Sequence, residues 1–424
     1  MSTCVHVIGA GLAGLAAAVR LRHLGAALTV YEAAPRGGGR CRSFHDPQLD
    51  ATIDNGNHLL LSGNTAAMTY LRELGAADRV ASPASAAFDF IDVRSQQRWS
   101  VNPGAAPWWI LDARRRVPDT SIIDYWSIVR LMRAPRDATV SACLDSTSVL
   151  FRRFWEPLTL AVLNTAPVEG AAVLLQAVLR ETVAKGADAC RPLIARENLA
   201  DALVDPAVAS LTRAGVNVRL GTRVERLAFA QDRVVSLAVD GATVPLAVDD
   251  VVILATPAWI AAELVPGLTV PPPGAPIVNV HYKLEDVGTS SAPQIVGVIG
   301  GLAQWVFRRG RIASVTISAA AAEADIAADE IAARCWPEVA SALGLASAPV
   351  PPSRVVKERR ATPAQTPAAV AARPGAQSAV ANLLLAGDWT DTGLPATIEA
   401  AVRSGFTAAQ IANARMTSLQ RGAA

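Results

Sequence analysis

Apolar and polar residues follow regular periods at the start of the chain, and these periods predict a strand, a helix and a second strand. Residues 4–8 form a short apolar run, and an alanine-rich stretch follows that ends at Gly25. A second apolar run covers residues 28–31 and ends at Glu32. A strand, a helix and a strand in immediate succession are typical of a parallel α/β fold.

Three glycines in the pattern G-x-G-x-x-G, namely Gly9, Gly11 and Gly14, join the first strand to the helix. The first permits a tight turn, the second lets backbone approach a pyrophosphate, and the third lets the helix pack on the strand. The helix N-terminus then offers free N–H groups to phosphates. Glu32 lies 18 residues after Gly14 and can accept both ribose hydroxyls, which disfavours a cofactor with a 2′-phosphate.

The rest of the chain alternates between two kinds of region. Strand and helix patterns like those at the start of the chain return twice further along it. The first intervening segment is rich in Trp, Pro and Arg at helical spacing, and the second is rich in strand patterns. We predict a discontinuous dinucleotide-binding domain of residues 1–79, 197–260 and 377–424, and a second domain of residues 80–196 (helical) and 261–376 (strand-rich). Residues 361–376 have the composition of a linker.

Composition narrows the class of protein. Of 424 residues 51% are hydrophobic and 18% charged, and the net charge is +2, so nothing indicates nucleic acid. The five cysteines form no C-x-x-C pair and the five histidines no ligand spacing, so we expect reduced thiols and no metal. We also expect a cytoplasmic protein, since no signal peptide and no apolar run of spanning length is evident.

A second glycine cluster follows Glu32: residues 36–40 read RGGGR, and ATIDNGNHLLLSGN comes at 51–64. These segments resemble the GG-doublet flavoprotein superfamily of amine oxidases, protoporphyrinogen oxidase and carotenoid desaturases. The resemblance implies FAD, in a Rossmann-like FAD-binding domain of the amine oxidase type with a second, α+β substrate-binding domain. It places Gly38, Gly39 and Arg40 at the pyrophosphate and ribityl chain. The residue types agree, because glycines admit a close cofactor and arginine offers a charged fork to phosphate.

The segment NLLLAGDWTDTGLPATIEAAVRSG, from residue 382, is the other strong motif. Asp388 would lie at the carboxyl end of a parallel strand, where α/β sheets bind ligands. The resemblance puts Thr397 and Ile398 at the flavin's carbonyl edge, and Val224 at adenine, although an alternating valine needs no function. No histidine or cysteine forms an attachment motif, so FAD is expected to be non-covalent. The expected cofactor-binding residues are Gly9, Gly11, Ala13, Gly14, Glu32, Ala33, Gly38, Gly39, Arg40, Gly56, Asn57, His58, Val224, Gly387, Asp388, Thr397 and Ile398.

Finer features, including QWVF at 304–307 and KERRATPAQTP at 357–367, look like the squalene-associated branch of the superfamily, the hydroxysqualene dehydroxylases of bacterial hopanoid synthesis. That resemblance implies reductive conversion of hydroxysqualene to squalene. Phytoene-type carotenoid desaturases and other amine-oxidase-type oxidases share much of the pattern. Isoprenoid-binding escort or GDI-like proteins share the fold without redox work, but such a binder has no need to keep Glu32, the glycine doublet and Asp388 together.

Loss of an allylic hydroxyl requires a proton donor and a dry apolar tunnel, while hydride comes from reduced FAD. Candidate catalytic residues are Asp54, His58 and Asp391. Asp54 capping a turn and His58 contacting FAD through its backbone are the alternatives. Trp259 and Trp305 are candidates for the tunnel, with core packing as the alternative. The sequence does not identify the donor that reduces the flavin.

One segment has the composition of a membrane-docking patch. Trp108, Trp109 and two aliphatic residues precede Arg114, Arg115 and Arg116. The segment 121–136 adds Trp126, Met132, Arg133 and Arg136. Because an isoprenoid substrate resides in lipid, we expect peripheral contact with the inner face of the cytoplasmic membrane. A helix packed in the second domain, with solvated arginines, is the alternative.

Overall fold

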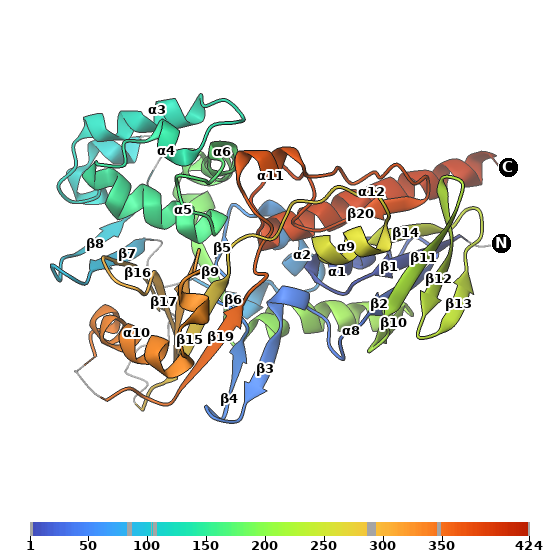
Figure 1. Ribbon diagram of the computed structural model, residues 1–424, viewed down its shortest axis with the longest axis horizontal. Coiled ribbons are helices and arrows are strands. Elements are labelled where there is room, and N and C mark those ends of the chain that lie inside the picture. Colours follow the sequence, from blue (N-terminus) through green and yellow to red (C-terminus); the bar gives the residue numbers. More distant parts are fainter. Residues whose placement is uncertain are drawn as a thin grey trace.

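The computed structural model describes residues 3–82, 87–102, 104, 108–285, 294–345 and 349–422. Both described ends of the chain lie in one lobe, at the right of Figure 1, which holds a parallel sheet and its helices. The other lobe, at the left, holds a larger mixed sheet with a layer of short helices above it.

The parallel sheet has the strand order β10-β2-β1-β14-β20. Its neighbours all pair in parallel, so every strand ends at the same edge. The order reverses between β1 and β14, and this is where open α/β sheets bind ligands. The strands are β1 (Cys4–Ile8), β2 (Ala27–Glu32), β10 (Asn217–Leu220), β14 (Val251–Leu254) and β20 (Leu383–Leu385).

Side chains alternate between two cores on the two faces of this sheet. Val7, Val30 and Ile253 pack under helices α1 (Leu12–Leu21), α8 (Asp205–Arg213) and α12 (Ile398–Gly422). Ile8, Val252 and Leu254 pack instead under α9 (Ala258–Leu264) and an antiparallel sheet. That sheet consists of β11 (Val224–Ala230), β12 (Arg233–Val239) and β13 (Ala242–Pro245).

Two glycines allow the closest contacts of this lobe. A Cβ on Gly14 would lie 1.9 Å from the carbonyl oxygen of Gly9, so α1 packs directly on the turn that precedes it. A Cβ on Gly405 would lie 2.2 Å from the carbonyl oxygen of Ala13. The backbones of α1 and α12 therefore approach each other where only glycine fits.

The second sheet has seven strands in the order β19-β15-β18-β17-β16-β7-β8. One face is apolar and packs on α10 (Ala328–Leu343). The opposite face turns toward the short helices and toward the loop after β4. The strands are β7 (Phe88–Asp92), β8 (Arg98–Val101), β15 (Ile277–Lys283), β16 (Gln294–Ile299), β17 (Trp305–Arg309), β18 (Ile312–Ile317) and β19 (Ser353–Glu358).

The remaining elements form the helical layer and the connections between the lobes. The helices are α2 (Thr65–Glu73), α3 (Ser127–Met132), α4 (Val140–Cys143), α5 (Glu156–Leu163), α6 (Ala172–Glu181), α7 (Ala187–Cys190) and α11 (Pro367–Ala371). Single-turn helices include η3 (Trp108–Leu111), η4 (Ala113–Arg115), η5 (Ile122–Trp126) and η8 (Ala200–Val204). Short strands are β3 (Ser43–Asp46), β4 (Ala51–Asp54), β5 (Leu60–Leu61), β6 (Val80–Ala81) and β9 (Pro192–Ala195).

Two expectations need correction. The segment 80–196 is not only helical, because β7 and β8 complete one edge of the seven-stranded sheet. Their sequences, FDFID and RWSV, are too short for periodicity to show. The stretch 361–376 is not an exposed linker: it contains α11, and Gln365 and Arg373 are buried within it.

Candidate functional site

Two glycine-rich segments lie side by side at the carboxyl edge of the parallel sheet. Gly11 and Gly38 form an isolated bridge, and the Gly38 N–H donates to the carbonyl of Ala10 at 2.7 Å. A Cβ on Gly11 would meet nothing within 4 Å, so the backbone there borders open space in front of α1. Bare backbone beside a helix N-terminus suits a pyrophosphate. The local structure therefore fits the cofactor that the sequence implies.

Glu32 is fixed at the end of β2. Its carboxylate accepts the backbone N–H of Ala10 at 2.8 Å and that of Ala34 at 2.9 Å. The backbone of Thr222 donates to the carbonyl of Glu32 at 2.8 Å, which brings Val224, at the start of β11, to the same region. The remaining lone pairs of the Glu32 carboxylate are available to ribose hydroxyls.

An ion pair joins the two halves of the site. Arg40, from the second glycine cluster, donates to Oδ1 of Asp388, and its other terminal nitrogen donates to the carbonyl of Ala361 at 2.7 Å. Burial alone would lower the pKa of Arg40, but the carboxylate of Asp388 raises it overall. The side chain of Asp388 is almost fully buried, whereas Arg40 is about one-third exposed. Arg40 therefore remains charged and presents one side toward the site.

Trp389 fixes the loop that carries Asp388. The Trp389 side chain is the largest fully buried one, and its indole N–H donates to the carbonyl of Thr256 at 2.9 Å. A Cβ on Gly387 would lie 2.3 Å from that indole nitrogen, so a glycine is required there. Gly387 is thus required by Trp389 as well as expected at the cofactor, and the role of Trp389, which the motif AGDW could have indicated, was not predicted.

The N-terminus of α12 is surrounded by buried polar side chains. The Ala396 N–H donates to Oε1 of Gln365 at 2.8 Å, and Arg373 donates to the carbonyl of Leu394 at 2.7 Å. Thr397 immediately precedes Ile398, and its Oγ1 accepts the N–H of Ala400 at 3.3 Å. Gln365 and Arg373 were not predicted as site residues, since their segment has the composition of a linker.

Arg373 adds positive charge beside this helix end. Burial lowers its pKa, opposed by the carboxylates of Asp388 and Asp391. Its Nε has no hydrogen-bond partner among the described residues. Asp391 is itself exposed and accepts the N–H of Gly393 at 3.3 Å. A cationic side chain and a helix N-terminus at one place favour an anionic group there.

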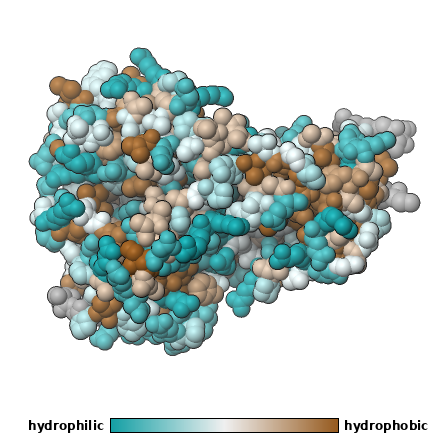
Figure 2. Space-filling view, in the orientation of Figure 1, coloured by the Kyte–Doolittle hydropathy of each residue, from teal (hydrophilic) through white to brown (hydrophobic). Residues whose placement is uncertain are grey.

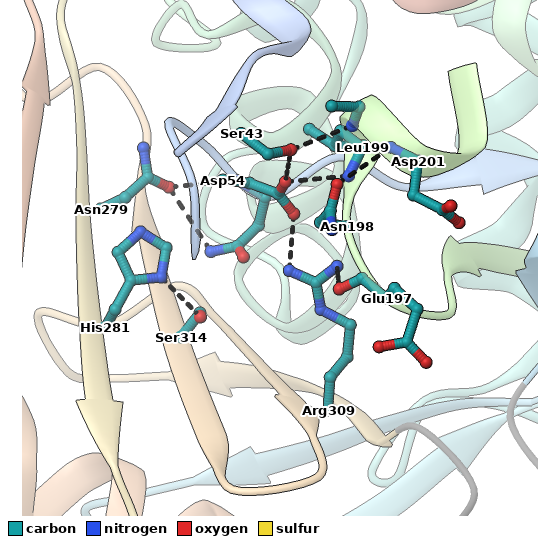
Figure 3. Close-up of polar contacts among 12 residues, drawn as sticks. Ser43, Asp54, Glu197, Asn198, Leu199, Asp201, Asn279, His281, Arg309 and Ser314 are labelled. Carbon is teal, nitrogen blue, oxygen red and sulfur yellow. Dashed lines mark hydrogen bonds and ion pairs between the residues drawn. The ribbon is translucent and has the colours of Figure 1, made fainter. Parts of the chain in front are cut away.

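Asp54 is held from three directions (Figure 3). Its Oδ1 accepts Ser43 Oγ at 2.6 Å and the Leu199 N–H at 2.9 Å. Its Oδ2 pairs with Nη2 of Arg309 at 2.6 Å. The side chain of Asp54 is only 3% exposed, and these contacts connect β4, the start of η8 and β17. Asp54 therefore ties three elements together.

His58 lies nearer to the predicted cofactor site. A Cβ on Gly56 would lie 3.8 Å from His58 Nε2. Desolvation of the half-buried side chain is the largest effect and lowers the pKa of His58, which favours the neutral imidazole. The charges of Arg40, Asp54 and Asp388 also act on the pKa of the imidazole, which Arg40 lowers and the two carboxylates raise.

A row of side chains crosses the open face of the seven-stranded sheet. Directly opposite residues on neighbouring strands share a face. The row runs, strand by strand, through Asn279, Thr316, Trp305, Gly297, Phe90 and Trp99. Asn57, in the loop after β4, donates to Thr316 Oγ1 at 3.0 Å, so the polar end of the row meets that loop.

The other end of the row enters the aromatic core of the helical layer. Phe90 packs on Trp305 with ring centroids 5.5 Å apart, and its ring occupies the space that Gly297 leaves free. The indole N–H of Trp305 is buried and has no partner among the described residues. Trp259 lies elsewhere, on α9, with the Arg360 guanidinium 4.9 Å from the ring centroid. Trp259 thus belongs to the domain of the parallel sheet, and Trp305 to the domain of the seven-stranded sheet. Of these two tryptophans, only Trp305 lies on the row.

The chain is similar to known proteins over nearly its whole length. The family model for flavin containing amine oxidoreductases matches residues 12–413. A hydroxysqualene dehydroxylase of Rhodopseudomonas palustris is 47% identical over 414 residues, which are 97% of this chain and 98% of that protein. A hydroxysqualene dehydroxylase of Sinorhizobium fredii is 44% identical over 411 residues, 96% of this chain and 98% of that protein.

Solved structures confirm the predicted fold class. Cyclohexylamine oxidase from Brevibacterium oxydans has a TM-score of 0.68 at 16% identity, covering 98% of this chain and 100% of that one. Putrescine oxidase bound to putrescine has a TM-score of 0.69 at 18% identity, covering 97% and 99%. The chain is an α/β protein with a Rossmann-like domain and a second α+β domain.

His281 makes stability depend on pH. The imidazole is fully buried, Nδ1 lies 2.8 Å from Ser314 Oγ, and burial lowers its pKa from 6.5 to about 4. Below pH 6.5 the unfolded chain takes up a proton that the folded chain refuses, so stability falls as the pH falls toward 4. Between pH 7 and pH 5 we expect a loss of about 2 kcal/mol from this residue. Thermal unfolding of His281→Gln should depend less on pH than that of wild type.

The exposed His23 provides the matched control, since His23→Gln should leave the pH dependence of thermal unfolding unchanged. Equal losses of stability in wild type and His281→Gln between pH 7 and pH 5 would show that His281 does not carry the effect.

Proposed function

The chain belongs to the flavin containing amine oxidoreductase family, and we propose that it is a hydroxysqualene dehydroxylase, which converts hydroxysqualene to squalene. Similarity to such enzymes over nearly the whole length of both chains carries this proposal. Family membership implies FAD. The row on the open sheet face supports an apolar substrate with one polar group, because it is aromatic at one end and polar at the other.

We place FAD along the carboxyl edge of the parallel sheet, bound without a covalent link. The pyrophosphate would lie between Gly11 and Gly38, and the adenosine ribose at Glu32. Arg40 and Asp388 would hold the ribityl chain, and the flavin ring would lie at the N-terminus of α12. Bound and reduced, this cofactor supplies a hydride.

In the proposed reaction the bond between carbon and the hydroxyl oxygen breaks, and a proton and a hydride are consumed. The hydroxyl group takes up the proton and leaves as water, while the carbon gains the hydride. The chain must therefore exclude water, hold the hydroxyl group in place and provide a proton. The buried aromatic face of the second sheet serves the first purpose.

The three candidate residues then take different roles. We propose that Asp54 is a positioning residue, because Ser43, Leu199 and Arg309 already occupy its carboxylate. We propose that Asp391, which is exposed, shapes its loop. We assign His58, which is half-buried beside Gly56, to the hydroxyl group of the substrate; because its lowered pKa disfavours the imidazolium, it would orient that group by a hydrogen bond and would not store the proton.

The substrate class implies work at a lipid surface. In the described part of the chain, no helix has both the length and the apolarity needed to cross a membrane. We propose that the protein takes its substrate from the surface of a membrane by peripheral contact.

The function is tested by incubating the FAD-loaded protein anaerobically with hydroxysqualene and dithionite, followed by product analysis. We expect squalene, formed only when reductant is present. The matched incubation replaces hydroxysqualene with phytoene and dithionite with an electron acceptor. Desaturated products from phytoene and no squalene would favour a carotenoid desaturase, and no turnover of either substrate by yellow protein would contradict both.

FAD affinity tests the cofactor assignment. Glu32→Ala removes a charge-assisted acceptor, at about 1.5–3 kcal/mol per hydrogen bond, so FAD should bind at least about tenfold more weakly. Asp388→Ala should weaken FAD as well, because it also frees Arg40. Fluorescence titration of the apoprotein measures both, and Asp391→Ala is the control. Acid precipitation should release all flavin; affinities equal to wild type in both variants would remove these residues from the site.

The indole N–H of Trp305, which has no partner in the described part of the chain, leads to a prediction about substrate binding. If its N–H donates to the substrate hydroxyl, Trp305→Phe loses about 0.5–1.5 kcal/mol, and kcat/KM should fall about two- to tenfold. Thermal stability and flavin content should change little, because phenylalanine keeps most of the packing. Trp155→Phe is the control, since its buried indole nitrogen also lacks a partner among the described residues. Equal effects of the two changes would argue against a specific role of Trp305.

A further inference from the structure

Large apolar side chains are exposed together on the helical layer. Trp108 is 68% exposed and Leu111 57% in η3, while Ile123 is 78% and Trp126 67% exposed in η5, with Ile122 at 39%. The two short helices contact each other. We call these five residues the apolar surface. Exposed aromatic and aliphatic groups this close together indicate an interaction site.

A buried pair directly behind the apolar surface holds it in place. Trp109 packs edge-on against Tyr125 with ring centroids 5.7 Å apart, and the Tyr125 hydroxyl accepts the N–H of Val117 at 3.0 Å. Each partner is the sequence neighbour of an exposed tryptophan, so burial of Trp109 and Tyr125 directs Trp108 and Trp126 outward. Trp109, expected in the docking patch, is therefore part of the core.

The positive charge of the chain is concentrated at the same place. Residues 108–136 contain six arginines and three aspartates, a net charge of +3, whereas the whole chain carries +2. The aspartates have local partners: Asp112 pairs with Arg114, Asp119 pairs with Arg153, and Asp124 accepts from Ser121. Arg130, Arg133 and Arg136 are exposed and form no ion pair among the described residues.

An open depression of about 480 Å³ adjoins the apolar surface, one turn further along α3. Arg130 and Arg133 line it together with apolar side chains such as Val129 and Ala138. Guanidinium groups above apolar walls match a phosphate headgroup with the first part of its acyl chains. In Figure 2 the upper-left part of the molecule, where α3 and α4 lie in Figure 1, shows hydrophobic groups among strongly hydrophilic ones.

We propose that the apolar surface and Arg130, Arg133 and Arg136 dock on a bilayer that contains anionic phospholipid. Aromatic and aliphatic side chains next to unpaired arginines complement an anionic interface, in which the rings enter the headgroup region and the arginines bind phosphates. A protein partner would need an acidic surface with a matching shape. The distribution of the exposed arginines does not require such a matching shape, and an anionic bilayer satisfies it.

The docking surface lies over the buried apolar cluster that contains the aromatic part of the row. Trp109 and Tyr125 belong to the same buried cluster as Trp99, Phe90 and Trp305. A molecule leaving the bilayer at the apolar surface would therefore meet apolar side chains up to the row on the seven-stranded sheet. This route rests on the proposed function, whereas the docking does not.

Vesicle co-sedimentation of the full-length FAD-loaded protein, without substrate, tests the docking. Wild type should bind vesicles of phosphatidylcholine with phosphatidylglycerol, bind pure phosphatidylcholine vesicles at least several-fold more weakly, and lose affinity as salt rises. A variant with Trp108→Ser, Ile123→Ser and Trp126→Ser should bind at least tenfold more weakly. Arg130→Gln with Arg133→Gln and Arg136→Gln should abolish the preference for anionic lipid.

Matched controls come from exposed residues of the other lobe. Val248 is 77% exposed and Arg223 is exposed, so Val248→Ser and Arg223→Gln should bind vesicles like wild type. Flavin content and thermal unfolding confirm that each variant is folded, and turnover in detergent tests the proposed function separately.

Three results would overturn the proposal. Wild type that does not pellet with anionic vesicles excludes docking. Folded triple variants that pellet like wild type exclude this surface. The third result is a wild-type dimer, seen by sedimentation velocity without lipid, that becomes a monomer in the variants while vesicle binding stays unchanged. The apolar surface would then be a contact between copies of the chain.

Discussion

Parallel pairing of β1 with both β2 and β14 is the constraint on which the site depends. Because β14 also pairs in parallel with β20, the strands that end at Ile8, Glu32, Leu254 and Leu385 all end at one edge. Segments far apart in the chain therefore meet there. Glu32 reaches the N–H of Ala10, and Arg40 reaches Asp388 across 348 positions of sequence. An antiparallel neighbour would bring its opposite end to this edge and separate these partners.

A buried ion pair joins the seven-stranded sheet to the hairpin of β3 and β4, which follows the second glycine cluster. Asp54 ends β4 and Arg309 ends β17, and both side chains are largely removed from water. Such a pair is weak evidence of net stability, yet loss of one partner leaves an uncompensated buried charge at a cost of about 3–5 kcal/mol. The pair therefore fixes the relative position of the two parts more than it strengthens either. Because Asn57 and His58 follow Asp54 closely in the chain, that position decides where they meet the sheet.

Local sequence predicted those parts whose physics is local. The glycine spacing after β1 and the acid at the end of β2 each depend on a few neighbouring residues. Burial that depends on distant segments was not predictable. Gln365 and Arg373 lie in an alanine- and proline-rich stretch that the fold buries against α12. Trp108 and Trp109 are adjacent and identical in type, and packing against distant residues such as Tyr125 decides which of them is buried.

For the proposed triterpene alcohol, the polar groups of the row have to provide most of the discrimination between the alcohol and the corresponding hydrocarbon. A triterpene that moves from a bilayer into an apolar cavity gains little, because the roughly 0.8 kcal/mol per CH₂ of burial applies to transfer from water. The energy that distinguishes an alcohol from the corresponding hydrocarbon must then come from a hydrogen bond. A site with an unpaired buried donor penalises any ligand that cannot accept from it. Within the described residues Trp305 has such a donor, at the boundary between the aromatic part of the row and Thr316. If Trp305 donates to the substrate hydroxyl as proposed, a product that has lost its hydroxyl leaves this donor unpaired again, so the same contact would select the alcohol and weaken binding of the hydrocarbon.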